Sequence, residues 1–165
     1  NVIKFTTGVG GETKLIGYNS DVIGFRESIK PLLTSSHKKA LILGTGGASK
    51  AVFHGLKQLG IKATFVSRES KESCLTYDAL TLGVMAEHTV IVNTTPLGMF
   101  PNIHNCPNIP YDLLSPRHIL YDLVYNPDET LFMTKGKERG AVVKNGLEML
   151  WLQAVAAWNI WQKQQ

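Results

Sequence analysis

The sequence is poor in cysteine and has no long apolar run. Only two of its 165 residues, Cys74 and Cys106, are cysteines, too few for the disulfide framework that stabilises small secreted domains. No stretch of about 18 apolar residues could cross a membrane. We therefore expect a reduced, cytoplasmic protein that has no membrane partner. The chain opens on Asn1 rather than on methionine, so we expect its natural N-terminus to lie further upstream.

Two common catalytic signatures are also missing. None of the five histidines pairs with another potential ligand at metal-binding spacing, and the isolated His104-x-Cys106 pair predicts no metal site. No Gly-x-Ser-x-Gly stretch occurs, which argues against a serine hydrolase of the α/β type.

The balance of charge is mildly basic. The chain has 17 lysines and arginines against 13 aspartates and glutamates, a net charge of +4. A positive charge suits nucleic acid or a small anionic ligand. The basic residues form no long run, and no aromatic residues interleave with them to stack on bases. The composition therefore favours a small anionic ligand over nucleic acid.

The order of predicted elements indicates an α/β fold. The length suits about one domain. A hairpin is expected from residues 2–7 and 13–18 around a turn at 8–11, and a helix over residues 23–33. Strands follow at 40–43, 61–66, 89–92, 118–124 and 141–143, with helices between most of them, least clearly at 70–82. Strands that alternate with helices predict a Rossmann-like, doubly wound, mostly parallel sheet with helices on both faces.

The last predicted helix, residues 147–162, is apolar on two sides. Trp151, Trp158 and Trp161 share one side, and the other side has Met149, Gln153, Ala156 and Ile160. We expect the tryptophans to pack on the sheet and the second side to face a cleft. The alternative is an ordinary core helix that is buried on both sides.

A glycine-rich turn joins the first sheet strand to the helix after it. Residues 44–49 read Gly-Thr-Gly-Gly-Ala-Ser, which is the dinucleotide-binding arrangement. Gly44 permits the tight turn, Gly46 lets the backbone approach a pyrophosphate, and Ser49 is small enough for close packing. The N-terminus of the helix offers free N–H groups and a positive dipole end to the phosphates.

The end of the second sheet strand bears on the choice of cofactor. An NAD site places a carboxylate there to hold the ribose hydroxyl, but this chain has Ser67, then Arg68, with Lys71 near. A guanidinium suits a 2′-phosphate and can stack on adenine, so NADP is favoured over NAD. Glu69 and Glu72 are evidence in the other direction.

Two further loops follow strands at the edge of the sheet where ligands bind in open α/β folds. Residues 93–99 read Asn-Thr-Thr-Pro-Leu-Gly-Met, and residues 121–127 read Tyr-Asp-Leu-Val-Tyr-Asn-Pro. Proline and glycine make the first of these loops a fixed one that a ligand can approach closely.

Five stretches in order along the chain resemble the motifs of the shikimate dehydrogenase family. Residues 17–25 resemble G-x-N-T-D-x-x-G-F, with Ser20 in place of threonine. The others are residues 44–51 (G-A-G-G-A-S/A-R-A), 93–99 (N-T/A-T-P-x-G-M), 121–127 (Y-D-x-x-Y-N-P) and 145–154 (N-G-x-x-M-L-x-x-Q-A).

The resemblance implies an NADP-dependent oxidoreductase of the shikimate pathway, in aromatic amino-acid biosynthesis. The reaction is hydride transfer between NADPH and the C3 carbonyl of 3-dehydroshikimate. The implied cofactor-binding residues are Gly44, Thr45, Gly46, Gly47, Ala48, Ser67, Arg68, Lys71, Asn93, Thr94, Thr95, Leu123, Gly146 and Met149. The implied substrate-binding residues are Asn1, Asp21, Tyr125 and Gln153.

Asp21 is also the implied catalytic residue, as the acidic partner of a lysine that relays the proton. Its sequence position alone indicates instead a helix N-cap, and that of Met149 equally suits core packing. The family's lysine belongs to an N-terminal substrate domain that has no counterpart here, so we expect the chain to be inactive alone. Where the family has N-R-T and a second arginine, Ser67, Arg68 and Glu69 keep only the first arginine, which weakens the case for NADP.

The expected division is a hairpin and domain connection (1–20), an NADP-binding domain (21–145) and a C-terminal helix at the cleft (146–165). The missing domain would normally cover that cleft. The sequence leaves open whether the protein forms a homodimer. Two alternatives remain: a quinate or other hydroxy-acid dehydrogenase, and a dinucleotide-binding module without catalysis.

Overall fold

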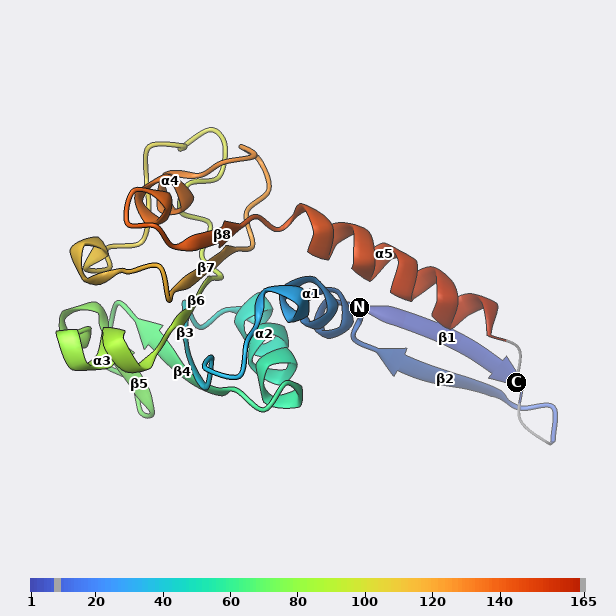
Figure 1. Ribbon diagram of the computed structural model, residues 1–165. Helices are drawn as coiled ribbons and strands as arrows, with labels where there is room; N and C mark the ends of the chain where they lie inside the picture. Colours follow the sequence, from blue (N-terminus) through green and yellow to red (C-terminus); the bar gives the residue numbers. More distant parts are fainter. Residues whose placement is uncertain (8–9, 164–165) are drawn as a thin grey trace.

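The computed structural model describes residues 1–7 and 10–163, which form a layered body with a long arm attached (Figure 1). The arm consists of a two-stranded antiparallel hairpin, β1 (Val2–Thr7) and β2 (Thr13–Tyr18), and of the C-terminal helix α5 (Leu147–Gln162). In Figure 1 the helix runs alongside the hairpin, away from the body. The body contains the rest of the described chain.

A six-stranded parallel sheet forms the centre of the body. Its strand order is β5-β4-β3-β6-β7-β8, and every neighbouring pair is parallel. The strands are β3 (Lys39–Leu43), β4 (Lys62–Ser67), β5 (Cys74–Thr76), β6 (Val90–Asn93), β7 (Ile119–Asp122) and β8 (Val142–Lys144). This is the order 3-2-1-4-5-6 of the doubly wound fold, in which ligands bind where the strand order reverses. Here that point lies between β3 and β6.

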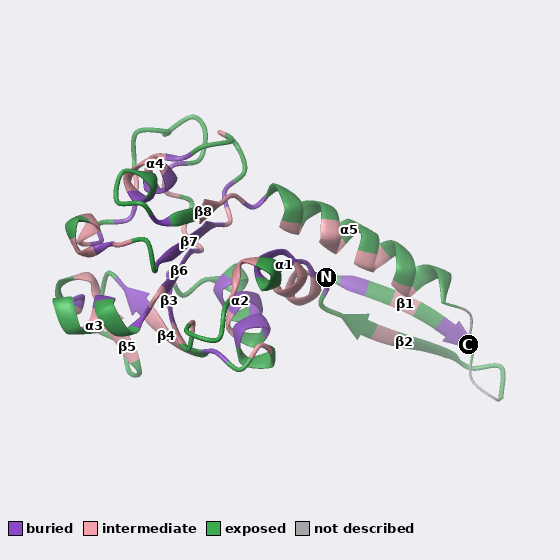
Figure 2. Ribbon diagram, viewed as in Figure 1, coloured by how far each residue is buried: buried purple, intermediate pink, exposed green. Residues whose placement is uncertain are grey.

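Helices cover both faces of the sheet, and each face has its own apolar cluster. On one face Ile42 and Tyr121 pack with Phe25 and Leu56 from helices α1 (Ser20–Ile29) and α2 (Gly47–Gln58). On the other face Leu41 and Leu120 pack with residues of α3 (Leu82–Glu87) and α4 (Leu131–Lys137). The central strands are buried throughout, whereas much of the arm is exposed (Figure 2). This explains why the strands read as unbroken apolar runs.

Most predicted elements are confirmed, with two differences. The predicted helix over 23–33 becomes α1 followed by the 3-10 turn Lys30–Leu32, because Pro31 has no N–H to continue the α-helical ladder. Residues 70–82 contain β5 and the 3-10 turn Tyr77–Ala79 instead of a helix. Three residues are too few to show the alternation of a strand. Residues 8 and 9 of the predicted turn lie outside the described residues.

The predicted orientation of α5 was wrong. Trp151, Trp158 and Trp161, predicted to pack on the sheet, are 69%, 61% and 55% exposed. The backbone of α5 at Met149 and Gln153 lies against Gly24 of α1 instead. A Cβ at Gly24 would lie only 2.6 Å from the backbone oxygen of Met149. Because the two helix backbones nearly touch, no tryptophan fits between them.

A chain of hydrogen bonds also fastens α5 to the body. The buried Tyr121 hydroxyl donates to Ser28 Oγ at 2.8 Å, and Ser28 Oγ donates to Glu148 Oε2 at 2.9 Å. Glu148 forms an ion pair with Lys144, whose Nζ also donates to the Ser28 carbonyl at 3.0 Å. This hydrogen-bond network joins β7, α1, the first turn of α5 and the end of β8.

We predict that Gly24→Ala lowers the free energy of unfolding by about 1–3 kcal/mol, because the new methyl group forces α1 and α5 apart. Gly83→Ala is the matched control. Gly83 also lies in a helix, a Cβ there meets no atom within 4 Å, and alanine should stabilise α3 by up to about 1 kcal/mol. Urea unfolding measures both. Equal stabilisation by the two substitutions would contradict the close helix contact.

Candidate functional site

The loop between β3 and α2 is shaped by Gly44. Its φ is +105°, and a Cβ at this position would lie 2.9 Å from Thr94 Oγ1. Only glycine adopts this conformation without strain, and only glycine leaves room for the neighbouring loop. Gly46 is the N-cap of α2 and makes no side-chain hydrogen bond, and a Cβ there would meet no atom within 4 Å. The loop therefore leaves open space beside its own backbone and beside the start of the helix.

Ser49 occupies the third position of the glycine motif. Its side chain is buried, and its hydroxyl donates to the Gly46 carbonyl at 2.6 Å. The hydroxyl thus closes the first turn of α2 without adding bulk against the sheet. This agrees with the packing role predicted for a small residue.

A cavity of about 700 Å³ opens beside this loop, and we call it the glycine-loop cavity. Its size lies within the usual range for small-molecule sites. Eight of the predicted cofactor-binding residues line it: Gly44, Thr45, Gly46, Ser67, Arg68, Lys71, Thr94 and Thr95. Gly47 and Ala48 lie in the first turn of α2, and Asn93 is buried at the end of β6.

The cavity also has lining residues that the sequence did not indicate: Thr76, Tyr77, Asp78, Cys106 and Asn108. The first three follow or end β5, which was not recognised as a strand. The other two lie in the loop after β6. Recognising β5 would have placed Tyr77 and Asp78 at the same sheet edge, because the carboxyl ends of parallel strands meet there.

Charges of both signs surround the cavity. Arg68 and Lys71 contribute positive charge, while Glu69 and Asp78 contribute negative charge. Burial raises the pKa of the Tyr77 hydroxyl, and the nearby Arg68 guanidinium partly opposes that rise. Arg68, just after β4, and Tyr77, just after β5, thus bring a guanidinium and a phenol hydroxyl to one cavity, and both groups can donate to an anionic ligand.

The loop after β6 and the loop after β7 are joined through buried polar groups. Asn93 Nδ2 donates to Asp122 Oδ1 at 2.9 Å, and Asn93 Oδ1 accepts from the N–H of Thr95 at 3.0 Å. Asp122 Oδ2 accepts from Thr130 Oγ1 at 2.6 Å. Asp122 is fully buried, and burial raises the pKa of its carboxyl to about 6 despite these hydrogen bonds.

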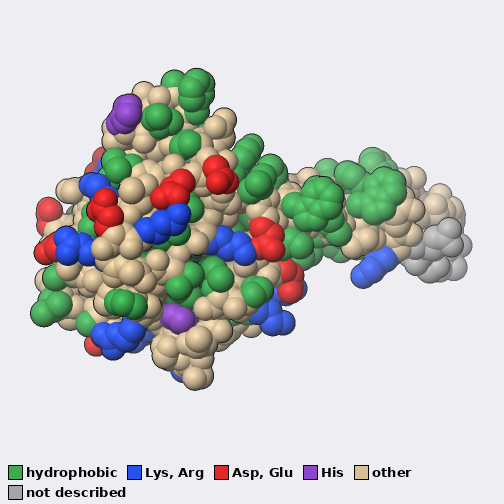
Figure 3. Space-filling view, turned by 45° about the horizontal axis from the view of Figure 1, so that its top comes forward, with side chains coloured by type: hydrophobic (Ala, Val, Ile, Leu, Met, Phe, Trp, Pro, Cys, Tyr) green, Lys and Arg blue, Asp and Glu red, His purple; other side chains and the backbone are tan. Residues whose placement is uncertain are grey.

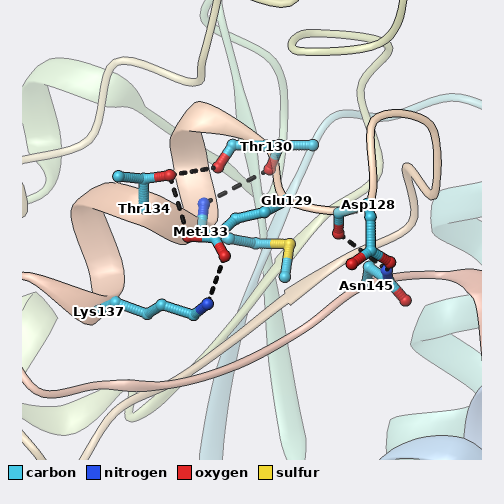
Figure 4. A network of polar contacts seen from close by, with 7 residues as sticks. All are labelled: Asp128, Glu129, Thr130, Met133, Thr134, Lys137 and Asn145. Carbon is cyan, nitrogen blue, oxygen red and sulfur yellow. Dashed lines mark hydrogen bonds and ion pairs between the residues drawn. The ribbon is translucent and has the colours of Figure 1, made fainter.

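The loop after β7 is also joined to the start of α5. Figure 4 shows Asn145 next to Asp128, and Asn145 Nδ2 donates to the Asp128 carboxylate at 2.7 Å. Thr130 caps α4 through the N–H of Met133. Glu129, between Asp128 and Thr130 in the sequence, forms an ion pair with Lys137 (Figure 4). The loop is therefore held at both ends.

Leu123, Gly146 and Met149, predicted to line the nicotinamide, lie where this loop meets α5. The N–H of Gly146 donates to the Val124 carbonyl at 3.1 Å, and a Cβ at Gly146 would overlap the backbone of Leu123. Met149 is half-buried against the α1 side of the core. The three residues are together, but they do not line the glycine-loop cavity.

A second cavity, of about 440 Å³, lies between α5 and the hairpin, and we call it the arm cavity. Asn1 and Gln153, two predicted substrate-binding residues, both line it together with Ser20. Asn1 Oδ1 accepts from the N–H of Ser20 at 2.8 Å. Tyr125 and Asp21 are not among its lining residues. Tyr125 is 48% exposed, and Asp21 lies half-buried next to Ser20 in the sequence.

The N-cap alternative for Asp21 was wrong. Asn19 caps α1, because its Oδ1 accepts from the N–H groups of Asp21 and Val22 at 3.1 and 3.3 Å. Asp21 lies in the first turn, where its negative charge interacts favourably with the helix dipole. Its carboxylate accepts no hydrogen bond from the described residues.

Two other absences hold for residues 1–7 and 10–163. No group of three or more histidine, cysteine, aspartate or glutamate side chains is arranged to hold a metal ion. No helix has the length and apolar character that a membrane crossing requires.

A glycine loop at the point where the order of a doubly wound sheet reverses, with basic residues after the next strand, defines a Rossmann-like domain of the dinucleotide-binding type. No family model matches the chain. The curated shikimate dehydrogenase (NADP(+)) of Caldicellulosiruptor saccharolyticus is 34% identical over 162 residues, which cover 90% of this chain and 58% of that protein.

Solved structures agree with this likeness. The shikimate dehydrogenase of Aquifex aeolicus matches with a TM-score of 0.77 and 34% identity, over 96% of this chain and 60% of the other. That of Thermus thermophilus, in complex with NADP(H) and shikimate, matches with a TM-score of 0.76 and 29% identity, over 90% and 58%. The chain is thus similar to shikimate dehydrogenases over 90% or more of its own length, and it spans about 58–60% of the length of these relatives.

We predict that Asp122→Asn increases stability more at neutral than at acidic pH. A raised pKa means that the folded chain binds this proton more tightly than the unfolded chain does. That stabilisation is complete below pH 3.8 and is lost as the pH rises through about 6. Asparagine avoids the loss, so its advantage over aspartate should grow by about 2 kcal/mol from about pH 4.5 to 7.5.

Urea unfolding at the two pH values measures this difference. Asp112→Asn is the control, because Asp112 is exposed and its substitution should leave the difference near zero. An advantage of Asp122→Asn that is the same at both pH values would show that the buried carboxylate is not the titrating group.

Proposed function

We propose that this chain is the NADP-binding part of a shikimate dehydrogenase, which reduces 3-dehydroshikimate to shikimate with NADPH. The observation that carries the proposal is the glycine-loop cavity, which lies at the sheet's switch point with Arg68 and Lys71 at its rim. The names of the curated relatives favour shikimate over quinate as the substrate of the whole enzyme.

The residues present fit an NADP molecule. The open backbone at Gly46 and the first turn of α2, with Gly47 and Ala48, would take the pyrophosphate. Ser67, Arg68 and Lys71 would hold the 2′-phosphate. The remaining proposed cofactor-binding residues are Gly44, Thr45, Asn93, Thr94, Thr95, Leu123, Gly146 and Met149. The cofactor supplies the redox chemistry, and the protein supplies binding and orientation.

The substrate would bind where the arm joins the body. Gln153 and Asn1 line the arm cavity with amide groups that can bond ring hydroxyls. We place Tyr125 and Asp21 at the same substrate, with Asp21 as the acidic group that shares a proton with a lysine from outside this chain. Asp21 has a carboxylate free for this role, since Asn19 caps the helix in its place.

The exposed side of the arm would be covered in the full-length protein. Trp151, Trp158 and Trp161 are each more than half exposed, although Trp161 Nε1 also donates to the Ile3 carbonyl of the hairpin at 3.1 Å. Leu147, Leu150 and Val155 are exposed as well, and Figure 3 shows hydrophobic side chains gathered along the arm. An apolar surface of this kind seldom stays bare. Because the relatives are longer, we assign it to their additional domain. The division into residues 1–20, 21–145 and 146–165 stays a prediction, as do a cytoplasmic location and a homodimer.

Cofactor binding and turnover can be tested separately. The chain alone should quench or shift NADPH fluorescence on titration, yet it should not reduce NADP with shikimate, since none of its lysines matches the catalytic lysine of the family. Turnover of shikimate by this chain alone would contradict the claim that the catalytic lysine lies outside it. A chain that leaves NADPH fluorescence unchanged would contradict the proposed function itself.

A substitution at Arg68 tests the choice between NADP and NAD. Arg68→Ala should weaken NADPH binding by about 1.5–3 kcal/mol, because it removes charge-assisted hydrogen bonds to the 2′-phosphate. NADH binding should change little. Arg139→Ala is the matched control, because Arg139 is an exposed arginine that does not line the cavity. Equal losses for NADPH and NADH at Arg68 would mean that the guanidinium only stacks on the adenine.

A further inference from the structure

Asp122 is a buried charge that the proposed function does not use. Its residue is 0% exposed at the carboxyl end of β7. No lysine, arginine or histidine within residues 1–7 and 10–163 forms an ion pair with it. Burying an unpaired carboxylate costs free energy unless hydrogen bonds compensate. Its value to the protein must therefore come from the groups that it holds.

Each carboxylate oxygen holds a different part of the sheet edge. Oδ1 accepts from Asn93 Nδ2 at 2.9 Å and from the N–H of Val124 at 3.0 Å. Oδ2 accepts from Thr130 Oγ1 at 2.6 Å, and Thr130 is the N-cap of α4. One side chain thus joins the end of β6, the loop after β7 and the start of α4.

The bond to Asn93 reaches the glycine-loop cavity. Because Asn93 Nδ2 points at an acceptor that cannot donate, its Oδ1 must face the other way. There it accepts from the N–H of Thr95 at 3.0 Å and from Thr95 Oγ1 at 2.7 Å. Thr95 lines the cavity. Asn93 Nδ2 has another acceptor, the Leu97 carbonyl at 3.4 Å, and a bond of that length is weak. Without Asp122 the amide of Asn93 is therefore held less firmly, and both of its bonds to Thr95 weaken.

The bond to Val124 leads towards α5. Val124 follows Leu123, and its carbonyl accepts from the N–H of Gly146 at 3.1 Å. Gly146 is the N-cap of α5, the helix that carries Gln153. Asp122 therefore lies between the loop that lines the cofactor cavity and the start of the helix that carries Gln153.

We propose that Asp122 is a positioning residue that holds Thr95 and its loop in the cofactor-binding arrangement, acting through the side-chain amide of Asn93. The inference rests on the proposed function only in taking NADP as the occupant of the cavity. The role requires the shape and the acceptor atoms of the side chain, not its negative charge.

Three variants test this role. Asp122→Ala removes both acceptors and should weaken NADPH binding at least about tenfold. Asp122→Asn keeps an oxygen for Asn93 and Val124, and its amide can donate to Thr130, so its affinity should stay within about threefold. Thr130→Val removes the bond to Oδ2 but leaves Asn93 untouched, so it should destabilise the fold and leave NADPH affinity within about threefold.

Amide hydrogen exchange of the free chain gives a measurement that needs no cofactor. In Asp122→Ala, exchange at Thr95 should accelerate at least about tenfold relative to wild type, because its bond to Asn93 Oδ1 becomes intermittent. In Thr130→Val it should not exceed the change at Ile42, a core amide that reports global opening. If Asp122→Ala fails to fold, Asp122→Ser, which also lacks the carboxylate, takes its place.

Selective loss in the alanine variant, with rescue by asparagine, supports the proposal. Wild-type affinity in Asp122→Ala, an equal loss in Thr130→Val, or unchanged exchange at Thr95 would overturn it. If wild-type chain binds no NADPH, the proposed function fails, and exchange at Thr95 still decides whether Asp122 positions the loop.

Discussion

The close passage of the β3–α2 loop over the end of β6 is the constraint on which the site depends. Gly44 turns with a positive φ at the point where a side chain would strike Thr94, and the Thr94 hydroxyl donates back to the Leu43 carbonyl at 2.7 Å. Because the two loops touch here, the chain must leave β3 in one direction and β6 in the other. The cavity and the exposed start of α2 lie at that divergence, and the residues after β4 add Arg68 and Lys71 beside them.

A close backbone contact at a glycine also determines how the arm is attached to the body. Gly24 lets α5 approach α1 until their backbones nearly touch, and the chain from Tyr121 through Ser28 to Glu148 fixes the first turn of α5. These contacts involve the side of α5 on which Met149 and Gln153 approach Gly24, and they leave the tryptophans of the helix more than half exposed. The arm is therefore held firmly at its base and presents exposed apolar side chains on its free side.

Much of the fold follows from local pattern. The apolar strands, the glycine turn and the helix after it are each visible in a few consecutive residues, and the structure has them at nearly the predicted places. β5 was missed because three residues carry no period, so Tyr77 and Asp78 were not assigned to the cavity. The orientation of α5 depends on one glycine in another helix, and the importance of Asp122 depends on partners 29 residues before it and 8 after it. Such pairings between distant residues leave no periodic signal in the sequence.

The central claim is that the glycine-loop cavity is the site of NADP, and an NMR titration of the isotope-labelled chain with NADP tests it most directly. The account predicts shifts of the backbone amides at Gly46, Arg68 and Thr95, with those on the far side of the body, such as Arg139, unchanged. Shifts confined to the arm, or none at millimolar NADP, would contradict it.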